Sequence, residues 1–518
     1  MTPTRSYLTV AIPFVNARPH LGYAYELVLA DVAARARRAL GPAGSVRLLG
    51  GTDEHAQKNV LAAEAAGVDT RAFVDANAAR FVELGAALGV SFDDFVRTSA
   101  DPRHRPAVER LWRAVAERGD LYRRPYAGDY CVGCEEFLAP GALVGGVCPE
   151  HGRPPERVEE DNWFFRLSAY RDQVEDLIAG GRLRVAPEPF RNEVLAFVRA
   201  GLDDVSVSRS AARARGWGVP VPGDPGQVVY VWFDALANYI SALGYGDPGG
   251  PGPAYRRWWD GGGSRVHVIG KGILRFHAVL WPAVLASAGE PPPDEVRVHP
   301  YLTAGGAKLS KSAGGGAGLA PGDVIARYGL DALRWWFARD VHPTVDTAFS
   351  PQRLVARADE DLAGGLGNVA GRIATLVARR GDGTVPPAAA GPPVAAVAGL
   401  AERTAEALAA FDLRGGTGLI VEAVAALNRD LEETRPWALA RDPARAAQLD
   451  AVLGRQLAAA REIAAAVAPV VPEGAARLAD RLAAGPDGRL PAAGPVFPRL
   501  GHGRRGAARR FAGVATAR

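Results

Sequence analysis

The sequence predicts an α/β protein in which a doubly wound parallel-sheet domain carries a cysteine-rich insertion and is followed by an α-helical bundle. Strand and helix patterns alternate in residues 1–117 and again in residues 228–295, as a parallel sheet covered by helices requires. All three cysteines lie between these two halves. From residue 359 to residue 481, alanine- and leucine-rich segments with helical periodicity replace the alternation, which is typical of a helical bundle.

The first half of the α/β domain has the pattern strand, helix, strand. Residues 8–15 are apolar and β-branched, residues 16–19 break the pattern, and residues 25–40 have helical periodicity. A second strand at 45–49 leads into the polar residues of segment 50–55. This βαβ unit predicts a parallel sheet that binds its ligands at the carboxyl ends of the strands.

The second half repeats the alternation. Residues 228–233 and 266–270 predict two further strands, followed by helices at 235–243 and 274–288. The cysteine-rich segment is therefore expected to be an insertion in the doubly wound domain.

The three cysteines have the spacing of a metal site. Cys131 and Cys134 are followed after 13 residues by Cys148 and His151, and two residues separate the members of each pair. Two pairs at this spacing predict a Cys3His zinc knuckle, a structural tetrahedral site without an open position. The alternative is a disulfide plus a free thiol, which the cytoplasm disfavours.

Lysine is rare in this chain, and its positions are therefore informative. Only four of the 61 lysine and arginine residues are lysine: Lys58, Lys271, Lys308 and Lys311. The last two stand within four residues of each other between glycine-rich segments, as in a loop that closes over a ligand. A lysine ammonium acts on phosphate as a point charge, so this segment is a candidate phosphate contact.

Length and composition limit the class of protein. A chain of 518 residues is too long for one core and predicts roughly three or four domains. The net charge of +4 permits a nucleic-acid partner without requiring one. No apolar run is long enough for a membrane span, and the N-terminus lacks the pattern of a signal peptide. A cytoplasmic location is expected.

Two motifs resemble the signatures of class I aminoacyl-tRNA synthetases. Pro19-His20-Leu21-Gly22 is similar to the first signature, and Lys308-Leu309-Ser310-Lys311-Ser312 is similar to the second. Further blocks resemble the methionyl-tRNA synthetase family, and together they span most of the chain. These blocks are residues 51–55, the Cys/His set, and residues 162–167, 230–235, 276–278, 364–368 and 435–437.

The resemblance implies a Rossmann-like catalytic domain and a two-step reaction. ATP, bound with Mg²⁺, and methionine give methionyl-adenylate and pyrophosphate, and the acyl group then passes to the 3′ end of a methionine tRNA. The implied catalytic residues are His20, Gly22, Tyr23, Lys308 and Lys311. The implied ATP contacts are His20, Gly22, Gly270, Lys308, Ser310 and Lys311.

The resemblance also implies a methionine pocket. An apolar, aromatic wall suits an unbranched thioether, and the Asp53 carboxylate would pair with the α-ammonium group. Without the resemblance, Trp232 and Tyr239 would be interpreted as core aromatics. The implied pocket residues are Ile12, Phe14, Asp53, Trp232, Ala235, Leu236, Tyr239, Ile273 and His277.

The helical bundle is implied to bind the CAU anticodon of the tRNA. Asn368 and Arg372 are four residues apart and hence on one helix face. Trp437 follows a proline and offers a stacking surface for a single-stranded base. No appended domain for dimerisation is visible, so a monomer is expected.

Several positions depart from the family pattern. Tyr23 stands where the family has histidine, Gly272 where it has aspartate, Phe14 where it has tyrosine, Ala56 where it has glycine, and Gly315 where it has asparagine. These departures leave two alternatives open. One is a paralogue that adenylates an amino acid and transfers it to an acceptor other than tRNA, as an amide ligase does, or that charges a different amino acid. The other is a non-catalytic tRNA-binding protein.

The expected domain organisation follows from these assignments. The catalytic domain is expected in two halves, with the zinc-knuckle insertion between them and the stem-contact region, the anticodon-binding bundle and a basic tail after them. The expected boundaries, in chain order, are 1–117, 118–227, 228–295, 296–355, 356–482 and 483–518.

Overall fold

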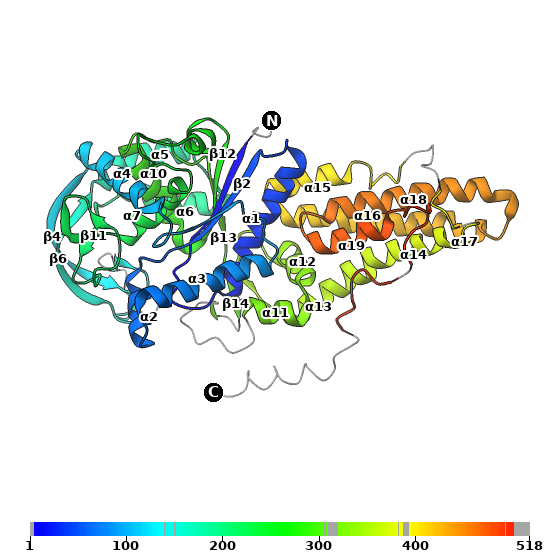
Figure 1. Ribbon diagram of the computed structural model, residues 1–518, viewed down its shortest axis with the longest axis horizontal. Coiled ribbons are helices and arrows are strands. Elements are labelled where there is room, and N and C mark those ends of the chain that lie inside the picture. The colour runs from blue at the N-terminus through cyan, green and yellow to red at the C-terminus, as the bar shows by residue number, and fades with distance from the viewer. Residues whose placement is uncertain are drawn as a thin grey trace.

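The molecule consists of an α/β part built on a parallel sheet and an elongated helical bundle beside it (Figure 1). The computed structural model describes residues 5–138, 141, 143–149, 152–304, 307–308, 320–381, 383–386, 393–492 and 494–501. Six parallel strands form the main sheet in the order β3-β2-β1-β12-β13-β7. Their bounds are β1 Ser6–Val10, β2 Val46–Thr52, β3 Asp94–Arg97, β7 Arg184–Ala186, β12 Ser264–Gly270 and β13 Glu295–His299.

Helices cover both faces of this sheet, which confirms the predicted doubly wound arrangement (Figure 1). Side chains of β1 alternate between the two cores: Leu8 and Val10 pack in one, and Tyr7 packs in the other. The first core contains α1 (Leu21–Leu40) and α3 (Thr70–Ala87). The second core contains α4 His104–Glu117, α5 Arg171–Ala179, α6 Glu188–Arg199 and α10 Trp281–Ser287.

The strands predicted at 8–15, 45–49 and 266–270 are all present with shifted ends. The helix predicted at 25–40 begins one turn earlier, at Leu21. His20 is its N-cap, and the His20 side chain accepts a hydrogen bond from Tyr23 N, so the helix is capped at the edge of the sheet.

The strand predicted at 228–233 is wrong as a member of the parallel sheet. Only its first two residues are in a strand, β11 (Asp224–Val229), which pairs antiparallel with β9 (Ser208–Ser210) and β10 (Pro220–Val221). The chain then turns at Tyr230 into the short helix α7 (Val231–Leu236). A short, fully buried apolar run has no periodicity that separates a strand from a helix, which explains the error.

One other predicted helix is present in pieces. The helix predicted at 235–243 is divided between the end of α7 and α8 (Asn238–Ser241). The helix predicted at 274–288 is instead confirmed as one helical run from Leu274 to Ser287, in which a π-helical turn, η4 (Phe276–Leu280), precedes α10; the 3-10 turn η3 (Lys271–Ile273) comes just before it.

The segment between the two halves forms two small antiparallel sheets. One has the order β5-β4-β6-β8 and the other β10-β11-β9. The short strand β7 lies in the same segment but pairs with β13 and extends the main sheet at its edge. The bounds are β4 Leu121–Cys131, β5 Glu136–Leu138, β6 Glu156–Phe165, β8 Val205–Ser206, β9 Ser208–Ser210 and β10 Pro220–Val221.

A connecting region follows β13. Its three-stranded sheet has the order β15-β14-β16, and three helices lead from it to the bundle. The bounds are β14 Leu302–Ala304, β15 Ala307–Lys308, β16 Thr347–Ala348, α11 Pro321–Tyr328, α12 Leu330–Asp340 and α13 Pro351–Arg357.

The predicted helical bundle is present and extends away from the main sheet (Figure 1). It begins with a π-helical segment, η5 (Ala358–Gly367), which runs directly into α14 (Asn368–Ala378). The remaining bundle helices are α15 Leu400–Ala409, α16 Leu413–Thr434, α17 Pro436–Leu439, α18 Ala446–Val467 and α19 Pro472–Leu482.

Arg334 on α12 joins the two parts of the molecule. Its side chain is fully buried, and its guanidinium donates to Asp31 Oδ2 of α1 at 2.7 Å and to Leu88 O at 2.9 Å. It also donates to Pro469 O and Val470 O between α18 and α19, at 3.2 and 2.7 Å. Acceptors in the α/β part and in the bundle thus hydrogen-bond to the same buried guanidinium group.

None of the helices in the described ranges combines the length and the apolar composition that a bilayer span needs.

Candidate active site

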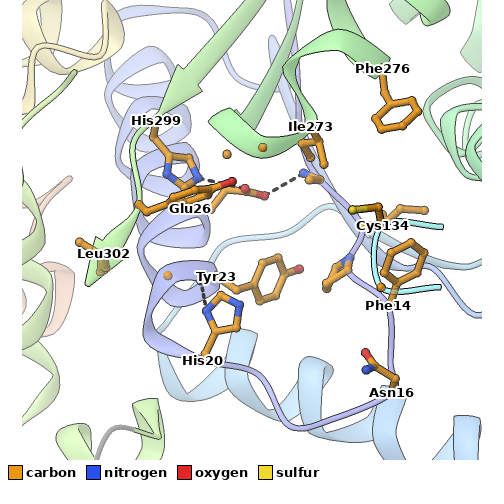
Figure 2. A pocket seen from close by; sticks show the side chains of 18 of the residues that line it. Phe14, Asn16, His20, Tyr23, Glu26, Cys134, Ile273, Phe276, His299 and Leu302 are labelled. Atoms are coloured by element: carbon orange, nitrogen blue, oxygen red, sulfur yellow. Dashed lines mark hydrogen bonds and ion pairs between the residues drawn. The ribbon is translucent and has the colours of Figure 1, made fainter. Parts of the chain in front are cut away.

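A cavity of about 340 Å³ opens at the carboxyl edge of the main sheet, between the N-terminus of α1 and the ends of β1, β12 and β13 (Figure 2). This is the edge at which the βαβ pattern predicted a ligand site. Eight of the predicted site residues line the cavity: Ile12, Phe14, His20, Gly22, Tyr23, Trp232, Gly270 and Ile273.

His20 and Gly22 form the end of α1 that faces the cavity. Tyr23 N donates to His20 Nδ1 at 3.3 Å. A Cβ atom on Gly22 would lie 3.0 Å from the imidazole ring, so the glycine makes room for His20. The N-terminus of a 20-residue helix carries unpaired N–H groups and a positive dipole end, which suits a phosphate group.

Tyr23 forms the buried wall beside His20. Its ring packs edge-on against Phe81 at 5.6 Å, and its hydroxyl is buried without a hydrogen-bond partner among the described residues. Burial, with smaller contributions from Glu26 and Tyr239, raises the pKa of Tyr23 well above its ordinary value. The phenol is therefore neutral and offers one hydrogen-bond donor.

The sequence prediction missed Glu26 and His299, which form a buried pair in the cavity wall. Glu26 Oε2 lies 3.0 Å from His299 Nε2, and Glu26 Oε1 accepts from Ala11 N at 2.9 Å (Figure 2). A detectable signal was the acidic Glu26 on the apolar face of the first predicted helix, one turn after Gly22 and Tyr23.

Aromatic side chains form the apolar wall of the cavity. Trp232 stacks on Phe276 with ring centroids 3.9 Å apart and an interplanar angle of 5°. Phe14 meets Trp232 edge-on at 6.1 Å. Trp232 Nε1 is buried and has no hydrogen-bond partner in the described part of the chain. Phe276 belongs to a block that the sequence singled out, but it was not predicted as a site residue.

Five predicted pocket residues lie behind this wall rather than in it: Asp53, Ala235, Leu236, Tyr239 and His277. Asp53 lies beside Phe14 on the neighbouring strand, with which it forms a parallel β-bridge. Burial, followed by the charges of Asp234 and Glu135, raises the pKa of Asp53 well above its usual range. Its Oδ1 has no hydrogen-bond partner among the described residues, so the carboxylate is suited to a cationic group.

Tyr239 and His277 support the wall from behind. Tyr239 Oη lies 2.8 Å from His277 Nε2, and His277 Nδ1 lies 2.9 Å from Ile273 O. The carbonyl accepts from Nδ1–H, so Nε2 accepts from the tyrosine hydroxyl and the imidazole is neutral. Burial lowers the pKa of His277 to about 4. Neither residue is an exposed polar contact in this structure.

Two histidines flank a buried aspartate on α7. Asp234 Oδ2 lies 2.6 Å from His55 Nδ1, and Asp234 Oδ1 lies 2.9 Å from His104 Nε2. Burial opposes ionisation, but the two imidazoles hold the pKa of Asp234 below its usual range. The contacts tie α7, which carries Trp232, to the segment that carries Asp53.

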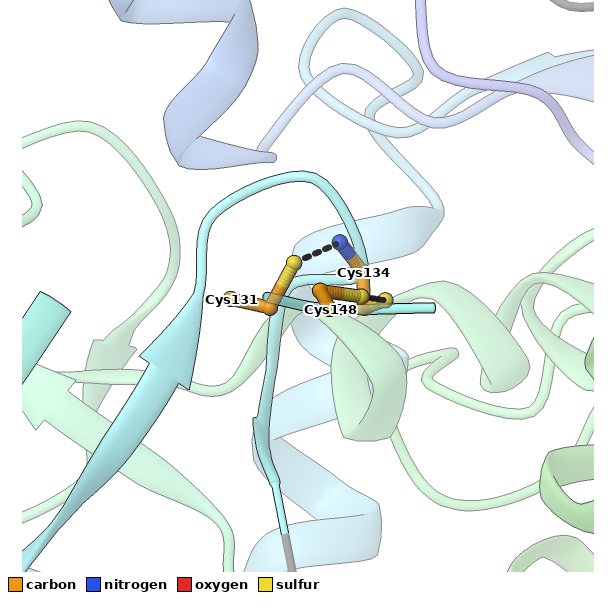
Figure 3. Close-up of side chains that lie close together, drawn as sticks. All are labelled: Cys131, Cys134 and Cys148. Atoms are coloured by element: carbon orange, nitrogen blue, oxygen red, sulfur yellow. Dashed lines mark hydrogen bonds between the residues drawn. The ribbon is translucent and has the colours of Figure 1, made fainter. Parts of the chain in front are cut away.

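The three cysteines come together at one turn (Figure 3). Cys134 Sγ lies 3.6 Å from Cys148 Sγ, and Cys134 N donates to Cys131 Sγ at 3.4 Å. The three Sγ atoms lie within 4.8 Å of one another, close to the spacing of about 3.8 Å that a tetrahedral zinc site with Zn–S bonds of about 2.3 Å requires. They form no disulfide. The predicted fourth ligand, His151, lies outside the described residues.

The cysteine turn is part of the cavity wall. Gly133, Cys134 and Glu136 line the cavity. Lys58, at the start of α2 (Gln57–Ala65), donates from Nζ to Gly133 O at 2.7 Å and lies 3.9 Å over the Phe14 ring. The cysteine turn and the aromatic wall are thus joined by one half-buried ammonium group.

The second predicted signature is described only in part. The backbone of Lys308 lies in β15, which pairs antiparallel with β14, with Thr303 opposite Lys308. Because Tyr301 and Leu302 line the cavity, this hairpin starts at the cavity edge. Ser310 and Lys311 lie outside the described residues.

The three predicted anticodon residues lie on neighbouring helices of the bundle. Arg372 on α14 stands 5.9 Å from the ring centroid of Trp437 on α17. Arg372 also donates to Asn428 Oδ1 at 3.2 Å and to Glu432 Oε1 at 2.7 Å. Asn368, the first residue of α14, is exposed. A guanidinium beside an indole is an arrangement suited to stacking on a base.

Residues 6–158 and 151–374 match a family model described as tRNA synthetases class I (M). The methionine--tRNA ligase of Brucella melitensis is 39% identical over 96% of this chain and 98% of its own length. The methionine--tRNA ligase of Streptomyces coelicolor is 37% identical over 95% of this chain and 96% of its own length.

Solved structures show the same similarity. The methionyl-tRNA synthetase of Mycobacterium tuberculosis in complex with methionyl-adenylate has a TM-score of 0.88 and 37% identity, covering 96% of this chain and 100% of that one. The apo form of the enzyme from that organism has a TM-score of 0.82 and 33% identity, covering 96% and 99%.

Proposed function

We propose that this chain, which belongs to the methionyl-tRNA synthetases of class I, forms methionyl-adenylate in the cavity between α1 and β12. The chain is a methionine--tRNA ligase: it activates methionine with ATP and transfers the methionyl group to tRNA. One observation carries the assignment of the site. A helix N-terminus suited to phosphate and an aromatic wall suited to a thioether face each other in one cavity.

The aromatic wall binds the methionine side chain. Phe14 and Trp232 provide apolar surface for the thioether, with Ile12 and Ile273 beside them. The α-ammonium is assigned to Asp53, whose buried Oδ1 has no hydrogen-bond partner among the described residues; a cation bound near this carboxyl group favours its ionised form. Ala235, Leu236, Tyr239 and His277 act indirectly, because they hold Trp232 and Ile273 in place.

The first step takes place between the N-terminus of α1 and the aromatic wall. A carboxylate oxygen of methionine attacks the α-phosphorus of ATP, the bond to the bridging oxygen breaks, and pyrophosphate leaves with its Mg²⁺. His20 and the N–H groups of α1 donate to the α-phosphate as its charge develops, and Tyr23 adds a neutral donor. Gly22 and Gly270 let the nucleotide approach the backbone closely. Lys308, Ser310 and Lys311 contact the departing pyrophosphate.

In the second step, a ribose hydroxyl at the 3′ end of the tRNA attacks the acyl carbon and AMP leaves. Recognition of the CAU anticodon is assigned to Asn368, Arg372 and Trp437. The pairing of Arg372 with the Trp437 ring supports this assignment, because stacking and hydrogen bonding are how unpaired bases are recognised. A cytoplasmic location and a monomeric state remain predictions.

Cys131, Cys134 and Cys148, with His151 as the fourth ligand, are assigned to one structural Zn²⁺. The clustered thiols support this assignment. A closed Cys3His site supplies folding energy and no reactive position, so it holds the cysteine turn against the cavity.

Pyrophosphate exchange with each amino acid, followed by charging of initiator and elongator methionine tRNAs, tests the proposal. Methionine-dependent exchange and charging of both tRNAs are expected. Exchange without charging would instead support transfer to another acceptor. Absence of exchange with every amino acid would leave only a tRNA-binding role.

A further inference from the structure

The space beside Gly272 is filled by the side chain of Tyr301. A Cβ atom built on Gly272 would overlap the Tyr301 hydroxyl oxygen and would lie 3.3 Å from Tyr301 Cζ. A side chain at position 272 would therefore displace the phenol. Both residues line the cavity, so the glycine decides which polar group this part of the wall presents.

Two neighbours hold Tyr301 in place. Its backbone N–H donates to Asp346 Oδ1 at 2.9 Å. Lys271 donates to both oxygens of the same carboxylate, at 2.8 and 2.9 Å, and its Nζ lies 4.6 Å from the centre of the Tyr301 ring. The ammonium attracts the face of the ring. The phenol is therefore held against Gly272.

The geometry of the cavity indicates which part of a bound nucleotide is expected near this phenol. Phosphates are expected at the N-terminus of α1, beside His20. Gly270 and Gly272 lie across the cavity, at and just after the carboxyl end of β12. A nucleotide that spans the cavity has its sugar between the phosphates and the base, next to this second wall.

We propose that the Tyr301 hydroxyl hydrogen-bonds a sugar hydroxyl of ATP and of the adenylate, and that Gly272 is the residue that admits it. The missing side chain at 272 is thus matched by a polar group from the residue that precedes β14. The inference rests on the cavity being the adenylate site. Tyr301 binds the sugar and takes no part in bond making.

Nucleotides that lack one sugar hydroxyl test this contact directly. Methionine-dependent pyrophosphate exchange is measured with ATP, 2′-deoxy-ATP and 3′-deoxy-ATP, for the wild-type protein and for Tyr301→Phe. One neutral hydrogen bond corresponds to about a three- to tenfold change. The variant is expected to raise the KM for ATP by that factor, with a smaller change in kcat and an unchanged KM for methionine.

The deoxynucleotides identify the hydroxyl. With the deoxynucleotide that lacks the sugar hydroxyl bonded to Tyr301, the wild-type protein and Tyr301→Phe should have the same KM, because the contact is already absent. With the other deoxynucleotide, the KM of Tyr301→Phe should exceed that of the wild-type protein by the same factor as with ATP. Equal losses with all three nucleotides, or no loss with ATP, would overturn the inference. Tyr328→Phe, on α11 and outside the cavity wall, is the matched control and should behave as wild type.

A second pair of variants tests the role of the glycine. Gly272→Ala should raise the KM for ATP, and Gly272→Ala combined with Tyr301→Phe should be no worse than Tyr301→Phe alone, because the overlapping oxygen is gone. A Gly272→Ala protein with wild-type KM values would overturn this part. If the wild-type protein exchanges normally and Tyr301→Phe has the same KM for ATP, only this inference is overturned. If the wild-type protein shows no exchange with methionine, the proposed function is overturned as well.

Discussion

Tyr23 is the cavity residue whose hydroxyl we expect to contribute to the rate of the first step. Its hydroxyl is buried in the cavity wall and unpartnered among the described residues. An unsatisfied buried hydroxyl costs about 1–3 kcal/mol, and a bound phosphate that accepts its hydrogen bond removes this cost. A phenol that stays neutral gives a donor but no positive charge.

Tyr23→Phe separates this role from packing. Loss of one transition-state donor lowers kcat on the order of 100-fold, and we expect such a loss in pyrophosphate exchange. Because the change removes an unsatisfied buried group, the thermal midpoint should stay the same or rise. Tyr25→Phe on the same helix is the control and should retain activity. A fully active Tyr23→Phe protein would show that the phenol only fills space.

His277 makes the stability of the fold depend on pH. Burial lowers its pKa from 6.5 in the unfolded chain to about 4, and burial shifts the pKa of His267 in the same direction. Between these values the unfolded chain binds a proton that the folded chain does not, so the free energy of unfolding falls as the pH drops from 6.5 toward 4. Each pH unit in this window removes up to about 1.4 kcal/mol through His277.

Urea unfolding near pH 7, 6 and 5 measures this dependence. The wild-type protein should lose stability steadily below about pH 6.5, and His277→Gln should lose less. Identical declines in the two proteins would mean that other groups account for the acid sensitivity.

At the scale of secondary-structure elements, the start of α2 links the cysteine turn to the aromatic wall. Lys58 donates to Gly133 O and lies over the Phe14 ring. Lys58→Met keeps the length of the side chain and removes the charge. The KM for methionine should rise about three- to tenfold, as the loss of one hydrogen bond and one cation–π contact implies.

The other parameters of the Lys58→Met protein identify the cause. The KM for ATP and the zinc content, measured by elemental analysis, should not change. Gln57→Met, one residue earlier on α2, is the control. Zinc loss from the Lys58→Met protein would show that the lysine supports the metal site rather than the wall.

The helices that the sequence predicted correctly have long, regular patterns. The first helix, α1, and the long bundle helix α18 have enough residues for their periodicity to be unambiguous. The strands of the first βαβ unit are short, and the order strand, helix, strand identified them. The apolar run at 228–233 was misassigned because a six-residue run fits a strand or a helix equally well. Tertiary contacts decide here: Asp234 must be on a helix to lie between His55 and His104.

The site residues that belong to one sequence motif could be predicted. Those that come together from segments far apart in the sequence were harder to predict. His20, Gly22 and Tyr23 follow from one motif. Glu26 and His299 form their pair across 273 positions of sequence, and Tyr301 acquires its position from the absence of a side chain at Gly272. Such contacts depend on the packing of the sheet, which no local pattern describes.

At the scale of the whole molecule, adenylate formation and anticodon binding are assigned to different ends. Figure 1 shows α14 and α17 on the bundle, away from the sheet that carries the cavity. Trp437→Ala should therefore leave methionine-dependent exchange unchanged. It should lower kcat/KM for tRNA charging about 10- to 100-fold, since stacking of one base contributes about 1–3 kcal/mol.

A tRNA with an altered anticodon is the control for this prediction. The wild-type enzyme should lose charging efficiency with it, and Trp437→Ala should lose little more. A variant that loses exchange as well would show a defect in folding or in communication between the two ends.

The fully buried Arg334 has a consequence for how tRNA is selected. Its guanidinium binds α1, the segment after α3 and the turn between α18 and α19 at once, and breaking a buried ion pair of this kind costs about 3–5 kcal/mol. The joint between sheet and bundle is therefore stiff. We therefore expect the bundle to stay at a fixed distance from the cavity, so that an RNA with the right three bases but the wrong length fails to place its 3′ end at the adenylate.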